Sequence, residues 1–353
     1  MLRAVSVGVY SNSRIGPVAE GRAKIVVVAT EGDPTLAELE GIPKNDDGSS
    51  AVLFRGRNFD EFSTPEGKQA LQEANVLLNC CGKKDLLSQL LPLAPKLAWI
   101  HSRSAGVDHS LFPALIEADN VSLTNARGLF SSSLAEYVVL SCLYFAKDVD
   151  RWKKNQREKN WDQFCVSEVS GTTLGVIGYG DIGHAAAVKA KAMGMKVVAQ
   201  RRRPELSEGD GLADEVFGTG QLGEVIARSD YILVAAALTP ESLGMVGAAE
   251  LSRAKPHAVI ISIGRGPIID EDAMTQMLQD GRLRGAALDV FCKEPLPTES
   301  KLWELDNVLL SPHNADLTAH FLNDSVRLFA DNVANFVKGE EVSIHLVDKR
   351  AGY

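Results

Sequence analysis

Residues 173–183 read Thr-Leu-Gly-Val-Ile-Gly-Tyr-Gly-Asp-Ile-Gly, and a helix-forming run, Ala-Ala-Ala-Val-Lys-Ala, follows at 185–190. This order predicts a strand, a glycine turn and a helix. Gly178 permits the tight turn, Gly180 lets the backbone approach a pyrophosphate, and Gly183 lets the helix pack closely on its strand. The stretch therefore predicts a dinucleotide site rather than a glycine turn without a ligand.

The phosphates of such a ligand would meet the free N–H groups of the helix N-terminus, at about Asp181 and Ile182. The next strand, expected at 196–199, is followed by three arginines that begin with Arg201 and Arg202. An NAD site usually places Asp or Glu there for the ribose 2′-hydroxyl, whereas guanidinium groups bind a 2′-phosphate. We therefore predict a preference for NADP(H), with NAD(H) also usable; the alternative is a basic surface turn in an enzyme tolerant of both.

Short apolar strands alternate with helical stretches along the whole chain, which predicts an α/β protein with parallel sheets. The second half is expected to form a Rossmann-type doubly wound sheet. Its strand candidates are 173–177, 196–199, 231–235, 258–262, 285–288 and 308–310. The first half offers strands at 24–30, 51–55, 75–81, 97–102 and 121–125, helices at 65–73 and 85–91, and loops over much of 35–65.

A long helical stretch is expected from about Ser132. One of three serines at 131–133 could cap it, and Glu136 is placed to close a capping box with Ser133. The stretch is apolar at first and becomes charged at 148–159. Because that run is mixed in sign, it indicates a solvated helix face rather than a nucleic-acid site.

Composition and charge restrict the function. The chain has 353 residues and a net charge of −9, so general attraction to nucleic acid or acidic lipid is not expected. No apolar run is long enough to span a bilayer. The five cysteines have no metal-binding spacing and fit a reducing compartment. We expect a cytoplasmic protein without a metal. Residues 1–19 contain Arg3 and Arg14 and no acid, so a mitochondrial targeting segment is the alternative to a short extension or a strand at 5–10.

Three polar residues follow three successive strands in the second half. Arg265 comes after 259–262, Glu294 after 286–289, and His313 after 308–310. Open α/β sheets bind ligands at the carboxyl ends of their strands, so we expect these side chains to form one site. An anion binder, a carboxylate and an imidazole are the groups that reduction of a 2-keto acid needs.

Several further motifs carry a family resemblance. They are Ser-Ala-Gly-Val-Asp (104–108), Leu-Ala-Glu (134–136), Ala-Leu-Thr-Pro-Glu-Ser (237–242), Leu-Asp-Val-Phe-Cys-Lys-Glu-Pro-Leu-Pro (288–297), Ser-Pro-His-Asn-Ala (311–315) and Leu-Val-Asp-Lys-Arg-Ala-Gly-Tyr (346–353). With the glycine loop and the Arg-Gly segment, they make most of the chain resemble the D-isomer-specific 2-hydroxyacid dehydrogenases. The motifs are specific for the family and poorly specific for the substrate.

The resemblance implies a role for each member of the trio. His313 would be the general acid/base, Glu294 its carboxylate partner, and Arg265 the group that binds the substrate carboxylate and polarises the carbonyl. Asp289 would contact the nicotinamide carboxamide. The remaining implied contacts are Ala236, Ala237 and Ile263 with the cofactor, and Cys81, Gly82, Ala105, Gly106 and Val107 with the substrate.

Two positions bear on how far the resemblance extends. The family often has Asn where this chain has Ser262, so a hydrogen bond there is expected to be rearranged. Glu294 argues against a formate dehydrogenase, because those related enzymes usually carry Gln at that position.

The resemblance also implies two domains and a homodimer. Residues 1–127 and 315–353 would form a smaller, flavodoxin-like α/β substrate domain, and residues 128–314 the dinucleotide-binding domain. The helix from Ser132 would be the dimer element. The leading interpretation is an NADPH-dependent reductase of the glyoxylate/hydroxypyruvate type. Alternatives are a D-3-phosphoglycerate or D-lactate dehydrogenase and, from another class, a dinucleotide-sensing corepressor.

Overall fold

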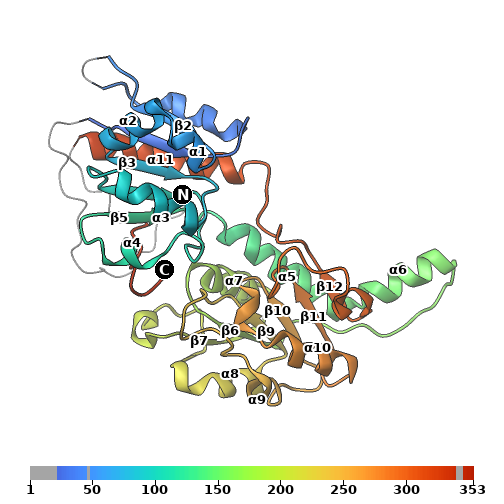
Figure 1. The fold of residues 1–353 in the computed structure, drawn as a ribbon. Coiled ribbons are helices and arrows are strands. Elements are labelled where there is room, and N and C mark those ends of the chain that lie inside the picture. Colours follow the sequence, from blue (N-terminus) through green and yellow to red (C-terminus); the bar gives the residue numbers. More distant parts are fainter. Residues whose placement is uncertain (1–21, 46–47, 339–344) are drawn as a thin grey trace. The chain divides into compact units, whose positions relative to one another are not determined.

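The computed structural model describes residues 22–45, 48–338 and 345–353. The strand considered at 5–10 and the question of a targeting segment lie outside these residues. The described chain forms two compact units, one of residues 130–316 and one of residues 22–129 with 317–353 (Figure 1). The divisions fall after residues 129 and 316, two residues beyond the boundaries expected from the sequence.

The unit of residues 130–316 is built on a seven-stranded sheet in which neighbouring strands pair in parallel. Its order is β12-β11-β10-β9-β6-β7-β8, so the chain starts in the middle at β6, runs to one edge, and then returns to build the other side. This is the Rossmann-type doubly wound arrangement, with the reversal between β6 and β9. The strands are β6 (Thr173–Ile177), β7 (Lys196–Gln200), β8 (Glu215–Phe217), β9 (Tyr231–Val234), β10 (Val259–Ser262), β11 (Gly285–Leu288) and β12 (Val308–Leu310).

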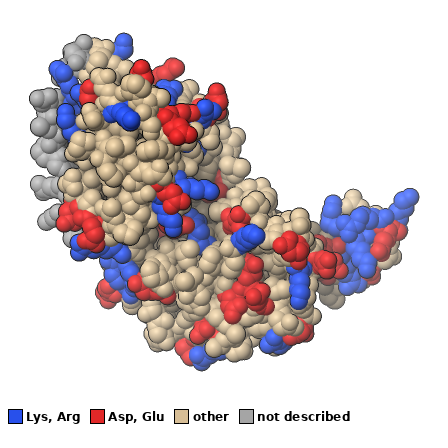
Figure 2. Space-filling model, in the orientation of Figure 1, with Lys and Arg blue, Asp and Glu red and all other residues tan. Residues whose placement is uncertain are grey.

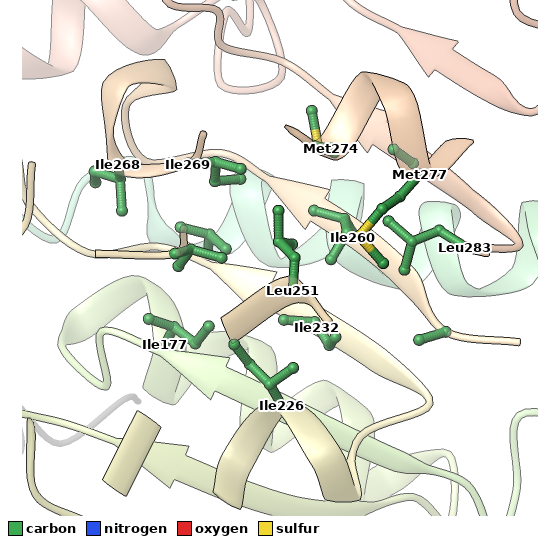
Figure 3. Packing of buried hydrophobic residues seen from close by; sticks show 14 of the residues in the cluster. Ile177, Ile226, Ile232, Leu251, Ile260, Ile268, Ile269, Met274, Met277 and Leu283 are labelled. Carbon is green, nitrogen blue, oxygen red and sulfur yellow. The ribbon is translucent and has the colours of Figure 1, made fainter. Parts of the chain in front are cut away.

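Helices cover this sheet, and their apolar faces complete its core. Figure 3 shows part of that core, where Ile177 of β6, Ile232 of β9 and Ile260 of β10 lie among side chains from the helices and their connections. These residues are fully buried, so the positions of the strand ends are fixed by packing. The helices are α5 (Ser131–Lys147), α6 (Val149–Glu158), α7 (Asp181–Ala192), α8 (Leu222–Arg228), α9 (Ala248–Leu251) and α10 (Glu271–Gln279).

The long helical stretch differs from expectation at both ends. α5 begins at Ser131 without a side-chain cap, so the predicted capping box between Ser133 and Glu136 is wrong. The Ser133 hydroxyl donates instead to the carbonyl of Ala315, 2.8 Å away. At its other end α5 stops at Asp148, which adopts a left-handed conformation with φ of 52° and starts a second helix, α6. α6 is mostly exposed, as predicted, and Figure 2 shows its lysines and arginines gathered on the surface.

The second unit is built on a five-stranded parallel sheet of order β2-β1-β3-β4-β5. This is the flavodoxin-like order. Its strands are β1 (Ile25–Val28), β2 (Val52–Gly56), β3 (Val76–Asn79), β4 (Trp99–Ser102) and β5 (Ser122–Asn125). Its helices are α1 (Phe59–Phe62), α2 (Pro65–Glu73), α3 (Lys84–Leu90), α4 (Pro113–Glu117) and α11 (Phe321–Val337). Two of the expected loops at 35–65 contain short helices, α1 and the 3₁₀ segment η1 (Pro34–Gly41).

The last helix belongs to the same unit as the first strand. Phe329 and Phe336 of α11 pack against Trp99 of β4, with ring centroids 5.3 Å apart in each case. Both phenylalanines and the tryptophan are buried in one core cluster with β1. The unit is therefore closed by segments from the two ends of the chain. Each of the helices described is too short or too polar to cross a bilayer.

Candidate active site

The glycine loop lies where β6 enters α7, beside the end of β9. Gly178 has φ of 91°, and a Cβ on it would come within 2.4 Å of the Ala236 backbone. A Cβ on Gly183 would come within 2.8 Å of the Gly178 carbonyl oxygen, so neither position has room for a side chain. Gly180 has open space around it, and α7 starts at the next residue, Asp181. A tight loop with one open glycine at a helix N-terminus fits a dinucleotide pyrophosphate.

The neighbouring strand ends approach the same loop. A Cβ on Gly264 would lie 2.6 Å from the carbonyl oxygen of Ala236, which shows how closely the chain after β10 passes the chain after β9. Ile263 is buried between them, whereas Ala237 is exposed. The expected cofactor-binding residues of these two strand ends are thus adjacent to the glycine loop.

The end of β7 carries guanidinium groups. Arg201 is partly buried, and its Nη1 donates to the Ser207 hydroxyl at 2.7 Å. Arg202 is exposed. The hydroxyl of Thr239, and more weakly the charge of Arg202, keep the pKa of Glu241 below its usual range. The N–H of Gly178 donates to the carbonyl of Gln200 at 3.0 Å, so the end of β7 lies beside the glycine loop. The arginines therefore lie beside the expected dinucleotide crevice.

Glu294 and His313 form a direct pair. The Nδ1 atom of His313 lies 2.7 Å from Oε2 of Glu294, and the other carboxylate oxygen accepts from the N–H of Phe291 at 2.9 Å. The imidazole and the carboxylate are 43% and 36% exposed, which leaves them accessible to a ligand. Since Nδ1 is used by Glu294, Nε2 is the ring nitrogen that can reach a substrate.

Arg265 follows β10 in an extended conformation and is partly buried. Its Nη1 donates to the carbonyl of Gly264 at 2.9 Å. The next residue, Gly266, is so close to the chain carrying Glu294 that a Cβ on it would lie 1.9 Å from the carbonyl carbon of Phe291. This contact brings the Arg265 and Glu294 segments together.

A buried carboxylate supports the loop that carries His313. Asp289 is 1% exposed, and its Oδ1 accepts from the Ser311 hydroxyl at 2.6 Å and from the N–H groups of Asn314 and Ala315 at 3.0 and 3.2 Å. The Ser311 hydroxyl also lies 3.1 Å from that of Tyr137 on α5. Burial raises the pKa of Tyr137 to about 12. This network and the Ser133–Ala315 bond tie residues 311–315 to α5 and β11.

The network contains residues that sequence patterns did not single out as functional. Ser133 and Ser311 occur in or beside quoted motifs, but nothing local indicates their partners. Tyr137 resembles any aromatic residue of an apolar helix. Ser262, expected to rearrange a hydrogen bond, has a buried hydroxyl with no hydrogen-bond partner among the described residues.

The sequence patterns also gave no indication of Asp316 as a residue of the site. It lies just after the supported loop and is partly buried, and burial raises the pKa of its carboxyl. The charge of Asp289 adds to that effect, whereas those of His313 and Arg265 oppose it. A fourth ionisable side chain therefore belongs to this cluster.

The expected substrate loops lie in the other unit, at the ends of β3 and β4. The N–H of Gly82 donates to Asn79 at 2.6 Å, and Cys81 beside it is exposed. The carbonyl of Ala105 accepts from Asn125 at 2.5 Å; Gly106 is partly exposed, whereas Val107 is buried. Side chains of the surrounding strands thus hold both loops.

Comparison with known proteins identifies the family. Residues 139–315 match the model of the D-isomer specific 2-hydroxyacid dehydrogenase NAD binding domain. Glyoxylate/hydroxypyruvate reductase B of Yersinia pestis (strain Pestoides F) is 30% identical over 317 residues, which cover 87% of this chain and 95% of the relative. Glyoxylate reductase of Thermococcus litoralis is 33% identical over 305 residues, covering 82% and 89%.

A solved structure agrees. The D-isomer specific 2-hydroxyacid dehydrogenase of Xanthobacter autotrophicus Py2, crystallised with NADPH and MES, has a TM-score of 0.77 and 28% identity, covering 94% of this chain and 100% of that one. The fold and the matches define an NAD(P)-dependent oxidoreductase that acts on the CH–OH group of its donor. The chain belongs to the D-isomer specific 2-hydroxyacid dehydrogenase family.

Proposed function

We propose that this protein uses NADPH to reduce a small 2-keto acid of the glyoxylate/hydroxypyruvate type to the D-2-hydroxy acid. The observation that carries the proposal is the 2.7 Å contact between His313 and Glu294, whose segment passes closely against the segment that carries Arg265. The two relatives above are a glyoxylate/hydroxypyruvate reductase and a glyoxylate reductase, which supports this substrate class.

Each polar side chain has a defined task in this proposal. Arg265 binds the substrate carboxylate through its planar N–H groups and polarises the keto carbonyl. His313 holds the proton at Nε2 and gives it to the keto oxygen, while Glu294 keeps the ring oriented through Nδ1. A bound nicotinamide dinucleotide supplies the hydride. The products are the hydroxy acid, the oxidised dinucleotide and a neutral imidazole that regains its proton from solvent.

The residues that would hold the dinucleotide surround the β6–α7 turn. The pyrophosphate would lie over Gly178, Gly180 and Gly183, against the N–H groups of Asp181 and Ile182. Ala236, Ala237, Ile263 and Asp289 would line the path to the nicotinamide. Arg201 and Arg202 would bind a 2′-phosphate, and the NADPH-bound Xanthobacter structure is consistent with that preference.

We propose that the backbone at five further residues binds the substrate: Cys81, Gly82, Ala105, Gly106 and Val107. We assign residues 1–127 and 315–353 to the substrate domain and residues 128–314 to the dinucleotide domain. We also propose a cytoplasmic homodimer in which α5 forms the dimer element; mitochondrial import is the alternative location.

The function is tested by following NADPH or NADH absorbance with glyoxylate, hydroxypyruvate, pyruvate and branched 2-keto acids. We expect turnover on at least one of the first two acids, faster with NADPH. Absence of turnover on the whole panel would contradict the proposal and favour a dinucleotide-sensing binding protein. Chiral analysis of the product should give the D-isomer.

Cofactor preference has its own test. Replacing Arg201 and Arg202 together with Ala should raise the KM for NADPH about 10- to 100-fold, because each lost charged hydrogen bond weakens phosphate binding. The KM for NADH should change much less. Replacing Arg253, an exposed arginine that pairs with Glu224, is the matched control. Equal changes for the two cofactors would show that the arginines do not bind a 2′-phosphate.

A further inference from the structure

A neutral side chain holds the guanidinium group of Arg201. Its Nη1 donates to the hydroxyl of Ser207 at 2.7 Å, and Ser207 is 8% exposed. Within the described parts of the chain, no carboxylate forms an ion pair with Arg201. Four other arginines of the same unit do pair with carboxylates: Arg151, Arg228, Arg253 and Arg282. Because a hydroxyl carries no charge, Ser207 fixes the guanidinium group without cancelling its positive charge.

Backbone contacts place Arg201 beside the glycine loop. The carbonyl of the preceding residue, Gln200, accepts from the N–H of Gly178 at 3.0 Å, and the N–H of Arg201 donates to a carbonyl of β8 at 3.0 Å. The chain then forms the 3₁₀ segment η3 (Pro204–Ser207), whose last residue provides the hydroxyl. Both the backbone and the guanidinium group of Arg201 are therefore fixed at the carboxyl end of β7, next to the turn expected to bind the pyrophosphate.

The unused donors of this guanidinium group suit a phosphate. A guanidinium group has five N–H donors in one plane, and Ser207 accepts from Nη1 alone, so donors remain for an anion. A side chain that is ordered before binding loses less entropy when the ligand arrives. We propose that Ser207 is a positioning residue that holds the charged Arg201 guanidinium group for the 2′-phosphate of NADPH. This inference rests on the proposed function, which gives Arg201 that ligand.

The test measures the Kd of NADPH and of NADH for the full chain by fluorescence titration. Ser207→Ala should raise the Kd of NADPH about fivefold, because it removes one hydrogen bond that orders Arg201. Ser207→Asp should raise it further, about 20-fold, because a carboxylate there would pair with the guanidinium group and repel the phosphate. The Kd of NADH, which lacks the 2′-phosphate, should stay close to that of the wild type in both variants.

A double-mutant comparison separates positioning from a general structural role. In a chain that carries Arg201→Ala, the further change Ser207→Ala should leave the Kd of NADPH unchanged, because the group that it positions is absent. The matched control is Ser252→Ala, since the Ser252 hydroxyl also makes a 2.7 Å hydrogen bond in this unit, to the carbonyl of Ala249. This control should keep both Kd values. NADH binding shows that each variant is folded, and Ser207→Asp provides the test if Ser207→Ala is not.

The outcomes distinguish this inference from the proposed function. Equal rises in the two Kd values, or an equal effect of Ser207→Ala with and without Arg201, would overturn the inference alone. An Arg201→Ala variant that binds NADPH as tightly as the wild type would overturn both the inference and the NADPH preference. Binding needs no turnover, so a wild type that reduces none of the 2-keto acids would contradict the proposed function and leave the role of Ser207 standing.

Discussion

Both units carry polar side chains at the carboxyl ends of their parallel strands, but these side chains are exposed in one unit and buried in the other. In the unit of residues 130–316, the carboxyl ends of the sheet expose Glu294 and His313. In the other unit, polar side chains at the ends of β3 and β4 turn inward. Asn79 is 2% exposed and bonds to both backbone groups of Gly82, and Arg103 pairs with Asp33 at 2.5 Å.

The difference is that one sheet presents accessible ionisable side chains, to which the proposed function gives the reaction, whereas the polar side chains of the other sheet support backbone loops. Arg103 also donates to the carbonyl of Cys80 at 3.0 Å, and its own carbonyl accepts from Ser325 of α11 at 2.6 Å. It therefore connects both expected substrate loops to the last helix. Substitution of Glu294 or His313 in the unit of residues 130–316 should reduce kcat. Substitution of the buried polar side chains in the other unit should reduce stability and substrate affinity.

The largest effect is expected from His313→Ala. Loss of the proton donor should lower kcat about 10²- to 10⁴-fold, because general acid catalysis contributes that much. NADPH affinity, measured by fluorescence titration, should stay close to that of the wild type. Replacing His257, which is exposed and pairs with Asp230, is the control. A His313→Ala enzyme that keeps its kcat would remove the distinction between the two units.

Arg103→Met should act on stability instead. The Thr35 hydrogen bonds and the Arg103 guanidinium offset the burial of Asp33 and hold the pKa of that carboxyl below its usual range. Without Arg103 a buried carboxylate loses its countercharge, which should lower the free energy of unfolding by on the order of 3 kcal/mol. Urea denaturation followed by tryptophan fluorescence measures this, since Trp99 lies in the same core.

The matched control for this change is Arg57→Met. Arg57 belongs to the same unit, but it pairs with Glu61 at the exposed surface. Its loss should have little effect on unfolding. If the Arg103 variant unfolded like the Arg57 variant, the buried pair would not be a support of the substrate loops.

Local sequence patterns were sufficient for the strands other than β8 and for the glycine loop, because these depend on runs of apolar residues and on backbone space. The edge strand β8 was missed, since it has three residues, of which Glu215 is exposed. The capping box failed because Ser133 finds a partner 182 residues away in sequence. The link between Tyr137 and Ser311 spans 174 residues, and the fold alone reveals such pairings.

A third prediction concerns the pH dependence of stability that a buried histidine of the second unit causes. His101 of β4 is fully buried beside Phe329, and burial lowers the pKa of its imidazole from 6.5 to about 3. The charge of His345 has the same direction of effect. The ring is therefore neutral in the folded chain, whereas the unfolded chain takes up a proton below pH 6.5. Stability due to the neutral ring is kept above pH 6.5 and lost as the pH falls toward 3.

At pH 5 this loss amounts to about 2 kcal/mol, since one unit of pKa difference is worth about 1.4 kcal/mol. His101→Gln should flatten the dependence of unfolding free energy on pH between 7 and 5. Urea denaturation at several pH values gives both curves. Parallel curves for the variant and the wild type would contradict the role of His101.

The smallest effect is expected from Tyr137→Phe, which removes one hydroxyl from the network behind His313 and keeps the ring. The loop would lose a hydrogen bond worth about 1 kcal/mol, and kcat should fall about fivefold with little change in KM. Tyr144→Phe is the matched control, because Tyr144 lies on the same helix and bonds to Asp150 instead. A change in KM rather than kcat would show that α5 contributes to substrate binding. The unit of residues 130–316 would then also support substrate affinity, the role inferred for the other unit.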